Sequence, residues 1–344
     1  MLLFNIKLLY IVEDADWVIY WNGKYITENL NNKFKLNSGL YNIGNLDGLR
    51  KIKNKILHFG SRSTYLPDNY KIVDSSNKVI FTWFHGMDSD KDFIQSLPQG
   101  SKKADIIHTA CTVSKNNLVG WGAEEEKIVI IPLGVGLKEF RKINEEEKLK
   151  IRQKLGIPED MICIGSFQKD GIGWEEGLKP KLEKGPDILC EVLEKIKKDF
   201  PVFVLLTGPA RGYVKKRLEE MGIPYKHFYV EYYPDVSKYY GALDYYIVSS
   251  RVEGGPLAIL ECFASGVPFV TTRVGMVEDI IEDGLNSLVS EVEDTQSLAE
   301  NLIKIMQDRG LKERLVNNGL ETVKKYDWSI IAEKFYKNIY SKLL

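Results

Sequence analysis

Short apolar runs alternate with segments of helical period in the C-terminal half of the chain. The apolar runs predict strands at 161–167, 202–208, 227–232, 245–250 and 268–273. The helix-like stretches between and after them are 185–200, 211–222, 234–243, 256–266 and 275–284. Continuous apolar strands that alternate with amphipathic helices are typical of a parallel sheet covered on both faces. This half is therefore predicted to be a doubly wound α/β domain.

The N-terminal half repeats this alternation less clearly, with candidate strands at 6–12, 56–61, 79–85, 108–114 and 127–135. The charged segment 138–160 contains no candidate strand and suits a domain connection. We place the boundary near residue 145, which gives two Rossmann-like domains at 1–145 and 146–325. Segment 326–344 is expected to be a helix that packs back on the N-terminal domain, because its apolar residues share one helical stripe: Trp328, Ile331, Phe335 and Ile339.

Composition narrows the classes of function. The 344 residues include 47 basic and 48 acidic side chains, so the net charge of -1 gives no overall field to attract nucleic acid. Four separated cysteines and four histidines suggest neither a disulfide framework nor a zinc ribbon, and a reducing cytoplasm fits them best. The N-terminal apolar run has no basic leader, and no stretch reaches the roughly 18 apolar residues of a membrane span. We interpret this run as the first buried strand.

The segment 250–261, SRVEGGPLAILE, places one carboxylate on a glycine-rich turn and a second on the helix that is predicted to follow. The turn follows a strand, and ligands of open parallel sheets bind at the carboxyl ends of the strands. Pro256 suits the first helical position, and the free amides of the helix start favour a phosphate or carboxylate. We therefore expect Glu253 at the mouth of a crevice between the domains and Glu261 one turn deeper.

These residues resemble the retaining nucleotide-sugar glycosyltransferases of GT-B fold, in particular glycosyltransferase family 4. The family's hallmark is a pair of glutamates separated by seven residues, with a glycine-containing turn after the first, and Glu253 and Glu261 have that spacing. Three more segments are similar to the family in the expected order: 111–140, 177–196 and 271–289. The resemblance covers residues from about 108 to 340. It implies a GT-B fold of two doubly wound domains, with the acceptor on the N-terminal side and the nucleotide sugar on the C-terminal side.

The resemblance assigns roles to both glutamates and to one lysine. Glu261 is expected to bind the ribose, because a carboxylate can accept hydrogen bonds from two adjacent hydroxyls. Glu253 is expected at the donor sugar, close to the anomeric centre. Lys184 matches the family's Lys-Gly-x-Asp helix start and would contact the diphosphate, on which negative charge grows as the sugar leaves. Taken alone, each glutamate is equally compatible with an exposed surface charge, and a solvated residue in a lysine-rich helix start is the less favoured alternative for Lys184.

Four further residues would complete the donor site. The family usually has an arginine shortly after the first strand of this domain, and here the strand runs into Gln168 and Lys169. Lys169 is expected to replace that arginine as a point charge, although an insertion before Lys184 leaves the alignment open. The turn residues Gly254 and Gly255 and the first helical amide, at Leu257, would cradle the phosphates, since proline has no N–H to donate.

The match is thinner in the N-terminal domain. His85, at the end of a strand, lies where family members often place a residue against the donor sugar, and an ordinary packed or solvated histidine is an equal alternative. Gly134 lies on the loop after the last strand and is expected to line the same site. The glycine-rich loop that many members carry after the first strand is missing. We interpret two Asp-x-Asp sequences, at 14–16 and 88–90, as acidic turns and expect no metal site.

A basic segment at 50–55 is the one candidate for membrane contact. It carries Arg50, Lys51, Lys53 and Lys55 with few acids nearby. Such a segment can rest on anionic lipid when the acceptor is lipid-linked, with an attraction of about 1 kcal/mol per residue. A solvated basic loop is the favoured interpretation, and a cytoplasmic protein at the inner membrane face is the alternative.

The sequence thus predicts a metal-independent, retaining hexosyltransferase-like enzyme without a cofactor. It would move a sugar from a UDP- or GDP-linked donor to a glycan, lipid-linked or small-molecule acceptor. A dinucleotide oxidoreductase is disfavoured, because no Gly-x-Gly-x-x-Gly follows a first strand. Two alternatives stay open: a sugar-nucleotide epimerase of the same fold and a non-catalytic nucleotide-sugar-binding subunit.

Overall fold

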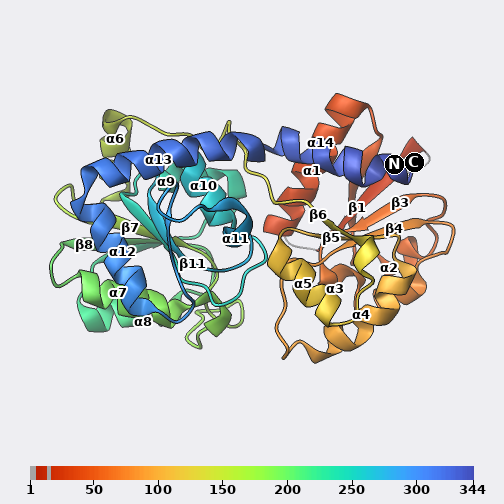
Figure 1. The fold of residues 1–344 in the computed structure, drawn as a ribbon, viewed down its shortest axis with the longest axis horizontal. Helices are drawn as coiled ribbons and strands as arrows, with labels where there is room; N and C mark the ends of the chain where they lie inside the picture. Colours follow the sequence, from red (N-terminus) through yellow and green to blue (C-terminus); the bar gives the residue numbers. More distant parts are fainter. Residues whose placement is uncertain (1–4, 14–16) are drawn as a thin grey trace. The chain divides into compact units, whose positions relative to one another are not determined.

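The computed structural model describes residues 5–13 and 17–344. The chain forms two compact units, shown in Figure 1. Unit 1 comprises Met1–Gly134 and Lys325–Leu344, and unit 2 comprises Val135–Lys324. The division in the middle of the chain thus falls at Gly134, before the charged segment that the sequence indicated as the connection.

Unit 1 contains a six-stranded parallel sheet in the order β2-β1-β3-β4-β5-β6. Its strands are β1 (Leu8–Val12), β2 (Ser38–Asn42), β3 (Ile56–Phe59), β4 (Lys78–Thr82), β5 (Ile106–Thr109) and β6 (Ile128–Ile130). Its α-helices are α1 (Val18–Phe34), α2 (Leu46–Leu49), α3 (Arg62–Tyr65), α4 (Lys91–Lys103), α5 (Thr112–Gly120) and α14 (Trp328–Asn338). Strands β1, β3 and β5 are completely buried, as parallel strands covered on both faces require.

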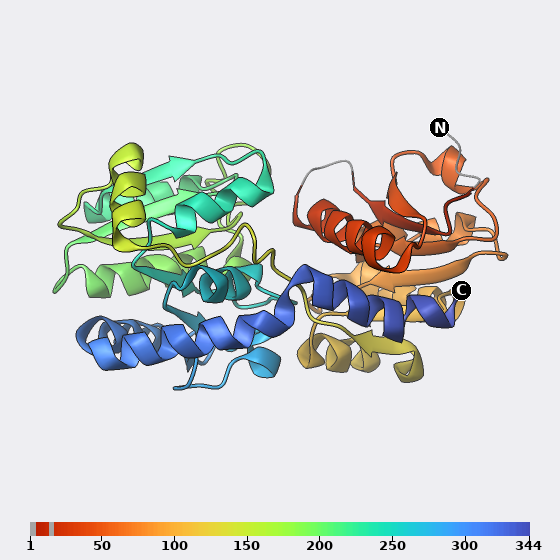
Figure 2. The same ribbon diagram turned by 90° about the horizontal axis from the view of Figure 1, so that it is seen from above.

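The last helix, α14, lies beside α1 within unit 1, as Figures 1 and 2 both show. The Trp328 and Tyr25 rings stack at a centroid distance of 5.5 Å, and the Tyr336 and Phe34 rings stack at 3.9 Å. The four residues of the apolar stripe are all buried: Trp328, Ile331, Phe335 and Ile339. The stripe therefore forms the face of α14 that packs on this unit.

Unit 2 also contains a six-stranded parallel sheet, in the order β12-β11-β10-β7-β8-β9. Its strands are β7 (Ile162–Phe167), β8 (Val202–Thr207), β9 (Tyr225–Phe228), β10 (Tyr245–Val248), β11 (Phe269–Thr272) and β12 (Leu288–Ser290). Its α-helices are α6 (Glu145–Leu155), α7 (Pro186–Ile196), α8 (Gly212–Met221), α9 (Ser237–Tyr240), α10 (Leu257–Ser265), α11 (Val277–Ile280), α12 (Thr295–Gln307) and α13 (Arg309–Val323). The predicted fold class, two doubly wound Rossmann-like domains, is confirmed.

Some sequence predictions of single elements were wrong. The expected strand at 108–114 ends at Thr109, because Cys111 caps the helix α5 that begins one residue later. The edge strands β2 and β12 were not predicted. The charged segment 138–160 contains α6, which starts with a capping box between Asn144 and Glu147 and ends at Gly156 in the left-handed conformation.

Two further features bear on the classes considered above. All four cysteines are buried and free, so no disulfide holds either unit. In the described part of the chain, no helix is both long enough and apolar enough to cross a membrane.

Candidate functional site

The carboxyl edge of the unit 2 sheet has a topological switch point between β7 and β10. These strands are neighbours, but the chain continues from β7 to β8 on one side and from β10 to β11 on the other. The connections after β7 and β10 therefore lead away from each other, and such a divergence is where open α/β sheets bind ligands. Lys184 lies on the connection after β7, and Glu253 lies on the connection after β10.

The structure brings Lys184 and Glu253 together at this edge. The Lys184 Nζ lies 2.7 Å from the Glu253 Oε1, and the Ser250 hydroxyl donates to the same oxygen at 2.9 Å. The two charged side chains keep 16% and 11% of their surface exposed. A cation and a carboxylate that are paired but still reach solvent can exchange their partner for a charged ligand. Two of the predicted site residues thus form one cluster.

A close backbone contact fixes this arrangement. Gly185, which follows Lys184, has a φ of 60°, and a Cβ there would lie 1.8 Å from the Ser249 carbonyl oxygen. The Ser249 hydroxyl also donates to the Gly185 carbonyl at 2.8 Å. Only glycine fits at this position, since both the conformation and the space exclude a side chain. The glycine therefore lets the Lys184 segment lie directly against the end of β10.

Arg251 ties the same two connections together, and the sequence analysis missed it. Its guanidinium donates to both carboxylate oxygens of Asp187, at 2.8 and 2.7 Å, and to the Leu182 carbonyl at 2.8 Å. Hydrogen bonds to Asp187 and then to Glu293 raise the pKa of Arg251. Asp187 is the last residue of the Lys-Gly-x-Asp start, so that motif carried a signal for an arginine partner. The bidentate pair holds Lys184 in register with Glu253.

Glu261 lies on α10 and is buried, with 5% of its surface exposed. Its two carboxylate oxygens accept hydrogen bonds from two tyrosines: Tyr233 at Oε1, and Tyr240 at Oε2 with a distance of 2.6 Å. Burial raises the pKa of Glu261, and the hydrogen bonds from Tyr233 and Tyr240 oppose that rise. This carboxylate is a hydrogen-bond acceptor held in a fixed orientation.

The turn before α10 is enclosed by the connection after β11. The helix begins at Leu257 with Pro256 as its N-cap, one residue later than predicted. Gly254 is buried and Gly255 is half-buried. Gly275 has a φ of 53°, and a Cβ there would come within 2.7 Å of the Glu253 carbonyl oxygen. The backbone at Gly275 therefore supports the turn that carries Glu253.

Lys169 lies on the insertion that follows β7. Its Nζ is 3.6 Å from the centre of the Trp174 ring, a cation–π contact. Desolvation by this packing, and then the charge of Lys181, lower the pKa of Lys169. The insertion is closed by two backbone hydrogen bonds, from Ile172 N to Lys179 O and from Lys181 N to Asp170 O, each of 2.8 Å. Lys169 is thus placed by the insertion, while Lys184 is placed by the edge of the sheet.

A buried ion pair underlies the insertion and was also missed from the sequence. The Arg211 guanidinium lies 2.9 Å from the Asp170 carboxylate, and neither side chain is exposed. Arg211 also donates to the carbonyls of Ser166 and Thr207, near the ends of β7 and β8. Although Arg211 opposes it, burial raises the pKa of Asp170. Nothing in the sequence distinguishes these charges from solvated loop residues.

The two candidate residues of unit 1 have different surroundings. His85 is half-buried. Burial alone would raise the pKa of Asp90, but hydrogen bonds from Arg62 and the Met87 amide lower it. The charge of His85 makes a smaller contribution in the same direction. Gly134 is buried under the Trp328 indole, and a Cβ there would approach the ring to 2.6 Å. The need for glycine at 134 is therefore explained by the packing of α14.

Both aspartates of the Asp-x-Asp sequence at 88–90 interact with side chains of unit 1. Asp88 accepts a hydrogen bond from the Trp121 indole at 3.1 Å, and Asp90 pairs with Arg62 at 2.8 Å. The sequence at 14–16 lies outside the described residues. Within 5–13 and 17–344, no group of three or more His, Cys, Asp or Glu side chains could hold a metal ion.

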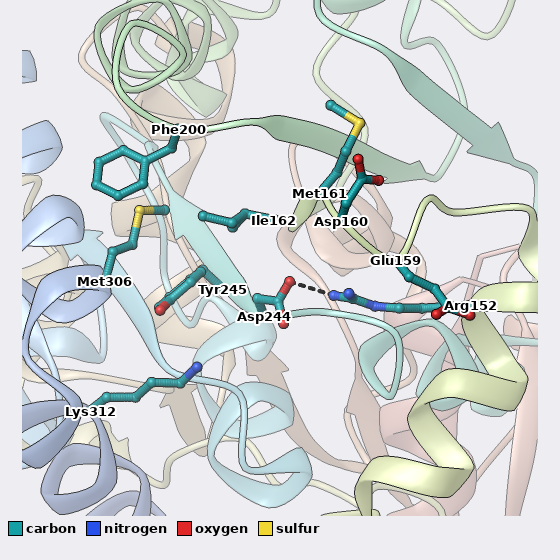
Figure 3. A pocket seen from close by; sticks show the side chains of 10 residues that line it. All are labelled: Arg152, Glu159, Asp160, Met161, Ile162, Phe200, Asp244, Tyr245, Met306 and Lys312. Atoms are coloured by element: carbon teal, nitrogen blue, oxygen red, sulfur yellow. Dashed lines mark hydrogen bonds and ion pairs between the residues drawn. The ribbon is translucent and has the colours of Figure 1, made fainter.

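A separate cavity of about 290 Å³ lies at the opposite edge of the unit 2 sheet (Figure 3). Ile162 and Tyr245, the first residues of β7 and β10, line it together with Asp244, which pairs with Arg152. Lys312 lies 4.7 Å from the centre of the Tyr245 ring. Because ligands of this fold class bind at the carboxyl ends of strands, this cavity at the amino ends is not the candidate site.

Comparison with known proteins agrees with the geometry. Residues 180–322 match the family model "Glycosyl transferases group 1". The matched segment begins just before Lys184 and includes both glutamates. This part of unit 2 is therefore a glycosyltransferase group 1 domain, and the sequences most similar to the chain include named glycosyltransferases.

Two relatives illustrate how much of the chain such sequence matches cover. An uncharacterized glycosyltransferase of Methanocaldococcus jannaschii is 24% identical over 61% of this chain and 53% of the relative. The N,N'-diacetylbacillosaminyl-diphospho-undecaprenol alpha-1,3-N-acetylgalactosaminyltransferase of Campylobacter jejuni is 24% identical over 92% of this chain and 82% of the relative. The chain spans about half the length of the archaeal relative and of the D-inositol 3-phosphate glycosyltransferases that it also matches.

Solved structures show the same fold along almost the whole chain. The crystal structure of Anabaena HepE in complex with UDP-glucose has a TM-score of 0.78 and 14% identity, and the match covers 98% of this chain and 100% of HepE. A sucrose-phosphate synthase of Thermosynechococcus elongatus has a TM-score of 0.77 and 14% identity with the same coverage. The fold of the two units is the GT-B fold.

Proposed function

We propose that this protein is a retaining glycosyltransferase of family 4 type, which transfers a sugar from a UDP- or GDP-linked donor to an acceptor hydroxyl. One observation carries the proposal: the Lys184–Glu253 pair lies at the switch point of a domain that matches the glycosyl transferases group 1 model. The reaction breaks the bond between the anomeric carbon and the diphosphate and forms a bond to the acceptor oxygen. The acceptor proton neutralises the departing nucleoside diphosphate.

Charge governs the proposed chemistry. Negative charge grows on the β-phosphate as the sugar becomes oxocarbenium-like, so a fixed cation there lowers the barrier. Lys184 supplies that cation, and its present bond to Glu253 is exchanged for one to the diphosphate. The turn residues Gly254 and Gly255 and the free amide of Leu257 at the start of α10 supply further positive potential. Glu253, released from Lys184, faces the hydroxyls of the donor sugar.

Glu261 is the proposed ribose ligand. Its fixed carboxylate can accept hydrogen bonds from both ribose hydroxyls, and its position about one turn into α10 suits a group on the nucleoside side of the diphosphate. Lys169 is proposed as a further phosphate contact, in the place of the family arginine. His85 and Gly134 of unit 1 are proposed to line the donor site on the acceptor side.

The donor base and the acceptor are inferred only from the names of similar proteins. HepE is described with UDP-glucose bound, so UDP-sugars are the first donors to test. The name of the Campylobacter relative specifies a diphospho-undecaprenol acceptor, which supports a lipid-linked acceptor here. A peripheral membrane contact through the segment 50–55 fits such an acceptor. Two of its charges are already partly offset within unit 1, because Arg50 and Lys53 each lie 3.5 Å from an aspartate.

One experiment tests the proposal against its two alternatives. The purified chain is incubated with UDP- and GDP-sugars, with and without acceptor glycans, and the sugars are followed by NMR. We expect release of the nucleoside diphosphate and a glycoside that keeps the donor's anomeric configuration. Conversion of the donor sugar without an acceptor would instead identify an epimerase. Donor binding without any turnover would identify a binding subunit, and an inverted product would contradict the retaining assignment.

A further inference from the structure

The carboxylate of Glu261 is closed by two tyrosines that differ in exposure. Tyr240 is completely buried, whereas Tyr233 is half-buried. Each hydroxyl donates to a different carboxylate oxygen. Glu261 itself has 5% of its surface exposed, so Tyr233 is the most exposed of the three side chains.

Tyr240 forms a fixed floor. Its ring stacks on Tyr246 at 5.6 Å and makes edge-to-face contacts with Phe167 at 4.9 Å and with Phe140 at 5.7 Å. Tyr246 in turn accepts a hydrogen bond from the Phe167 amide at 2.7 Å. Aromatic packing on three sides leaves this ring no room to move without opening the core.

Tyr233 belongs to a surface segment. It begins the short 3₁₀ helix Tyr233–Val236, directly after a loop whose Tyr229 and Tyr232 are 66% and 53% exposed. Its ring lies 6.2 Å from Phe140, a more distant contact than those that hold Tyr240. A side chain at the rim of a loop can rotate away from its hydrogen-bond partner without disturbing the core.

We propose that Tyr233 is a latch that occupies the Glu261 oxygen needed by a ribose hydroxyl and that rotates away when a nucleoside diphosphate binds. The ligand class rests on the proposed function. The phenol mimics the ribose hydroxyl, because both present one O–H to the same carboxylate oxygen. In the closed state the buried carboxylate stays hydrogen-bonded, which avoids the penalty of an unpaired buried acceptor. Binding then exchanges one hydroxyl donor for another.

A latch weakens the apparent affinity by the fraction of molecules that are open. If about one molecule in ten is open, removal of the latch hydroxyl tightens binding about tenfold. Tyr233→Phe removes only that hydroxyl. Tyr240→Phe is the matched control, because it removes the same kind of hydrogen bond from the same carboxylate at the buried floor. The control should bind a nucleoside diphosphate no tighter than the wild type.

The test is calorimetric titration of the full-length wild type and both variants at pH 8 with UDP, GDP and inorganic pyrophosphate, which has no ribose. We expect Tyr233→Phe to bind UDP or GDP about tenfold tighter, with unchanged affinity for pyrophosphate. Its donor KM should fall by the same factor while kcat stays constant. A uniform gain for all three ligands would overturn the latch, because the effect would then be unrelated to ribose.

The outcomes also separate the latch from the proposed function. Wild-type protein that binds UDP or GDP, together with a Tyr233→Phe variant of equal or weaker affinity, overturns the latch alone. If neither the wild type nor Tyr233→Phe binds either nucleotide, the nucleotide-sugar function fails and the latch fails with it. Tighter binding by both tyrosine variants would show a general loosening around Glu261 and would also overturn the latch.

Discussion

Two ion pairs hold the connection after β7 to the carboxyl edge of the same sheet, and they differ in exposure. Arg211 and Asp170 are completely buried, whereas Lys184 and Glu253 keep 16% and 11% of their side-chain surface exposed. The buried guanidinium also bonds to backbone carbonyls of two strands, so its bonds are made permanently on folding. The exposed pair is accessible to a ligand that can replace one partner. Both pairs carry the same charges, so access to solvent is what distinguishes the proposed binding pair from the structural one.

The largest effect is expected from the scaffold pair. Arg211→Met leaves Asp170 buried without its cation, and the loss of one partner of a buried pair costs about 3–5 kcal/mol of unfolding free energy. Urea denaturation followed by circular dichroism measures this change. The double variant Arg211→Met/Asp170→Leu should recover most of the loss, because it removes the unpaired charge. A single variant as stable as the wild type would show that the pair contributes nothing to the fold.

The exposed pair should show the opposite pattern, with a large effect on activity and a small one on stability. Lys184→Gln removes the cation that is proposed to stabilise the departing diphosphate, and kcat should fall about 100- to 1000-fold. The free energy of unfolding should fall by less than in Arg211→Met, because Glu253 keeps some contact with solvent and the hydrogen bond from Ser250. Lys195→Gln, in the last turn of α7 where the half-buried Lys195 donates to Gln296, is the control for a lost lysine. Equal activity of the two variants would place Lys184 outside the reaction.

The sequence predicted Lys184 and Glu253 as separate site residues, though not their ion pair, and it missed both Arg211 and Asp170, for a physical reason. Glu253 and Lys184 lie in local motifs whose glycines and helix starts are visible along the chain. The Arg211–Asp170 pair depends on an insertion that folds back across the sheet, and local pattern carries no information about that burial. Tyr233 escaped notice in the same way, because its partner Glu261 is 28 residues away in the chain.

The strands show the same limit. The sheet interior was predicted because buried parallel strands are continuous apolar runs. β2 was missed because it is an edge strand of sequence Ser-Gly-Leu-Tyr-Asn that pairs only with β1 and is nowhere fully buried. β12, an edge strand of the unit 2 sheet, is fully buried, but its three residues are too few to stand out as an apolar run. Exposure thus explains why β2 was missed, and shortness explains why β12 was missed.

A smaller effect is expected at Glu261, which sharpens the comparison because it is buried and yet is proposed to bind a ligand. Glu261→Gln keeps the shape but removes the charge, so contacts of about 1.5–3 kcal/mol weaken and donor KM should rise roughly tenfold or more. kcat should change less, because the ribose is remote from the bond that breaks. Unchanged donor KM in a correctly folded variant would remove Glu261 from the site.

The wild type should also show a pH dependence that the Gln variant lacks. Burial raises the pKa of Glu261, so the carboxylate begins to protonate at a higher pH than an ordinary glutamate as the pH falls. The charged form is the proposed ribose ligand, so its contribution to affinity should be complete above that pKa and lost below it. Donor KM of the wild type should therefore rise on acidification, whereas donor KM of Glu261→Gln should stay constant over the same pH range.

Metal removal is expected to have the smallest effect. It tests whether the positive groups of the protein suffice for transfer without a metal ion. Lys184 and the amides at the start of α10 are proposed to supply the positive potential at the diphosphate, so treatment with EDTA should leave kcat and donor KM unchanged. Progress curves before and after chelation, with readdition of manganese, measure this. Activity that disappears and returns with manganese would contradict the metal-free proposal. Asp88→Asn then decides where the metal acts, because loss of the manganese response in that variant would assign the ion to the 88–90 turn of unit 1, where Asp88 now accepts a hydrogen bond from Trp121.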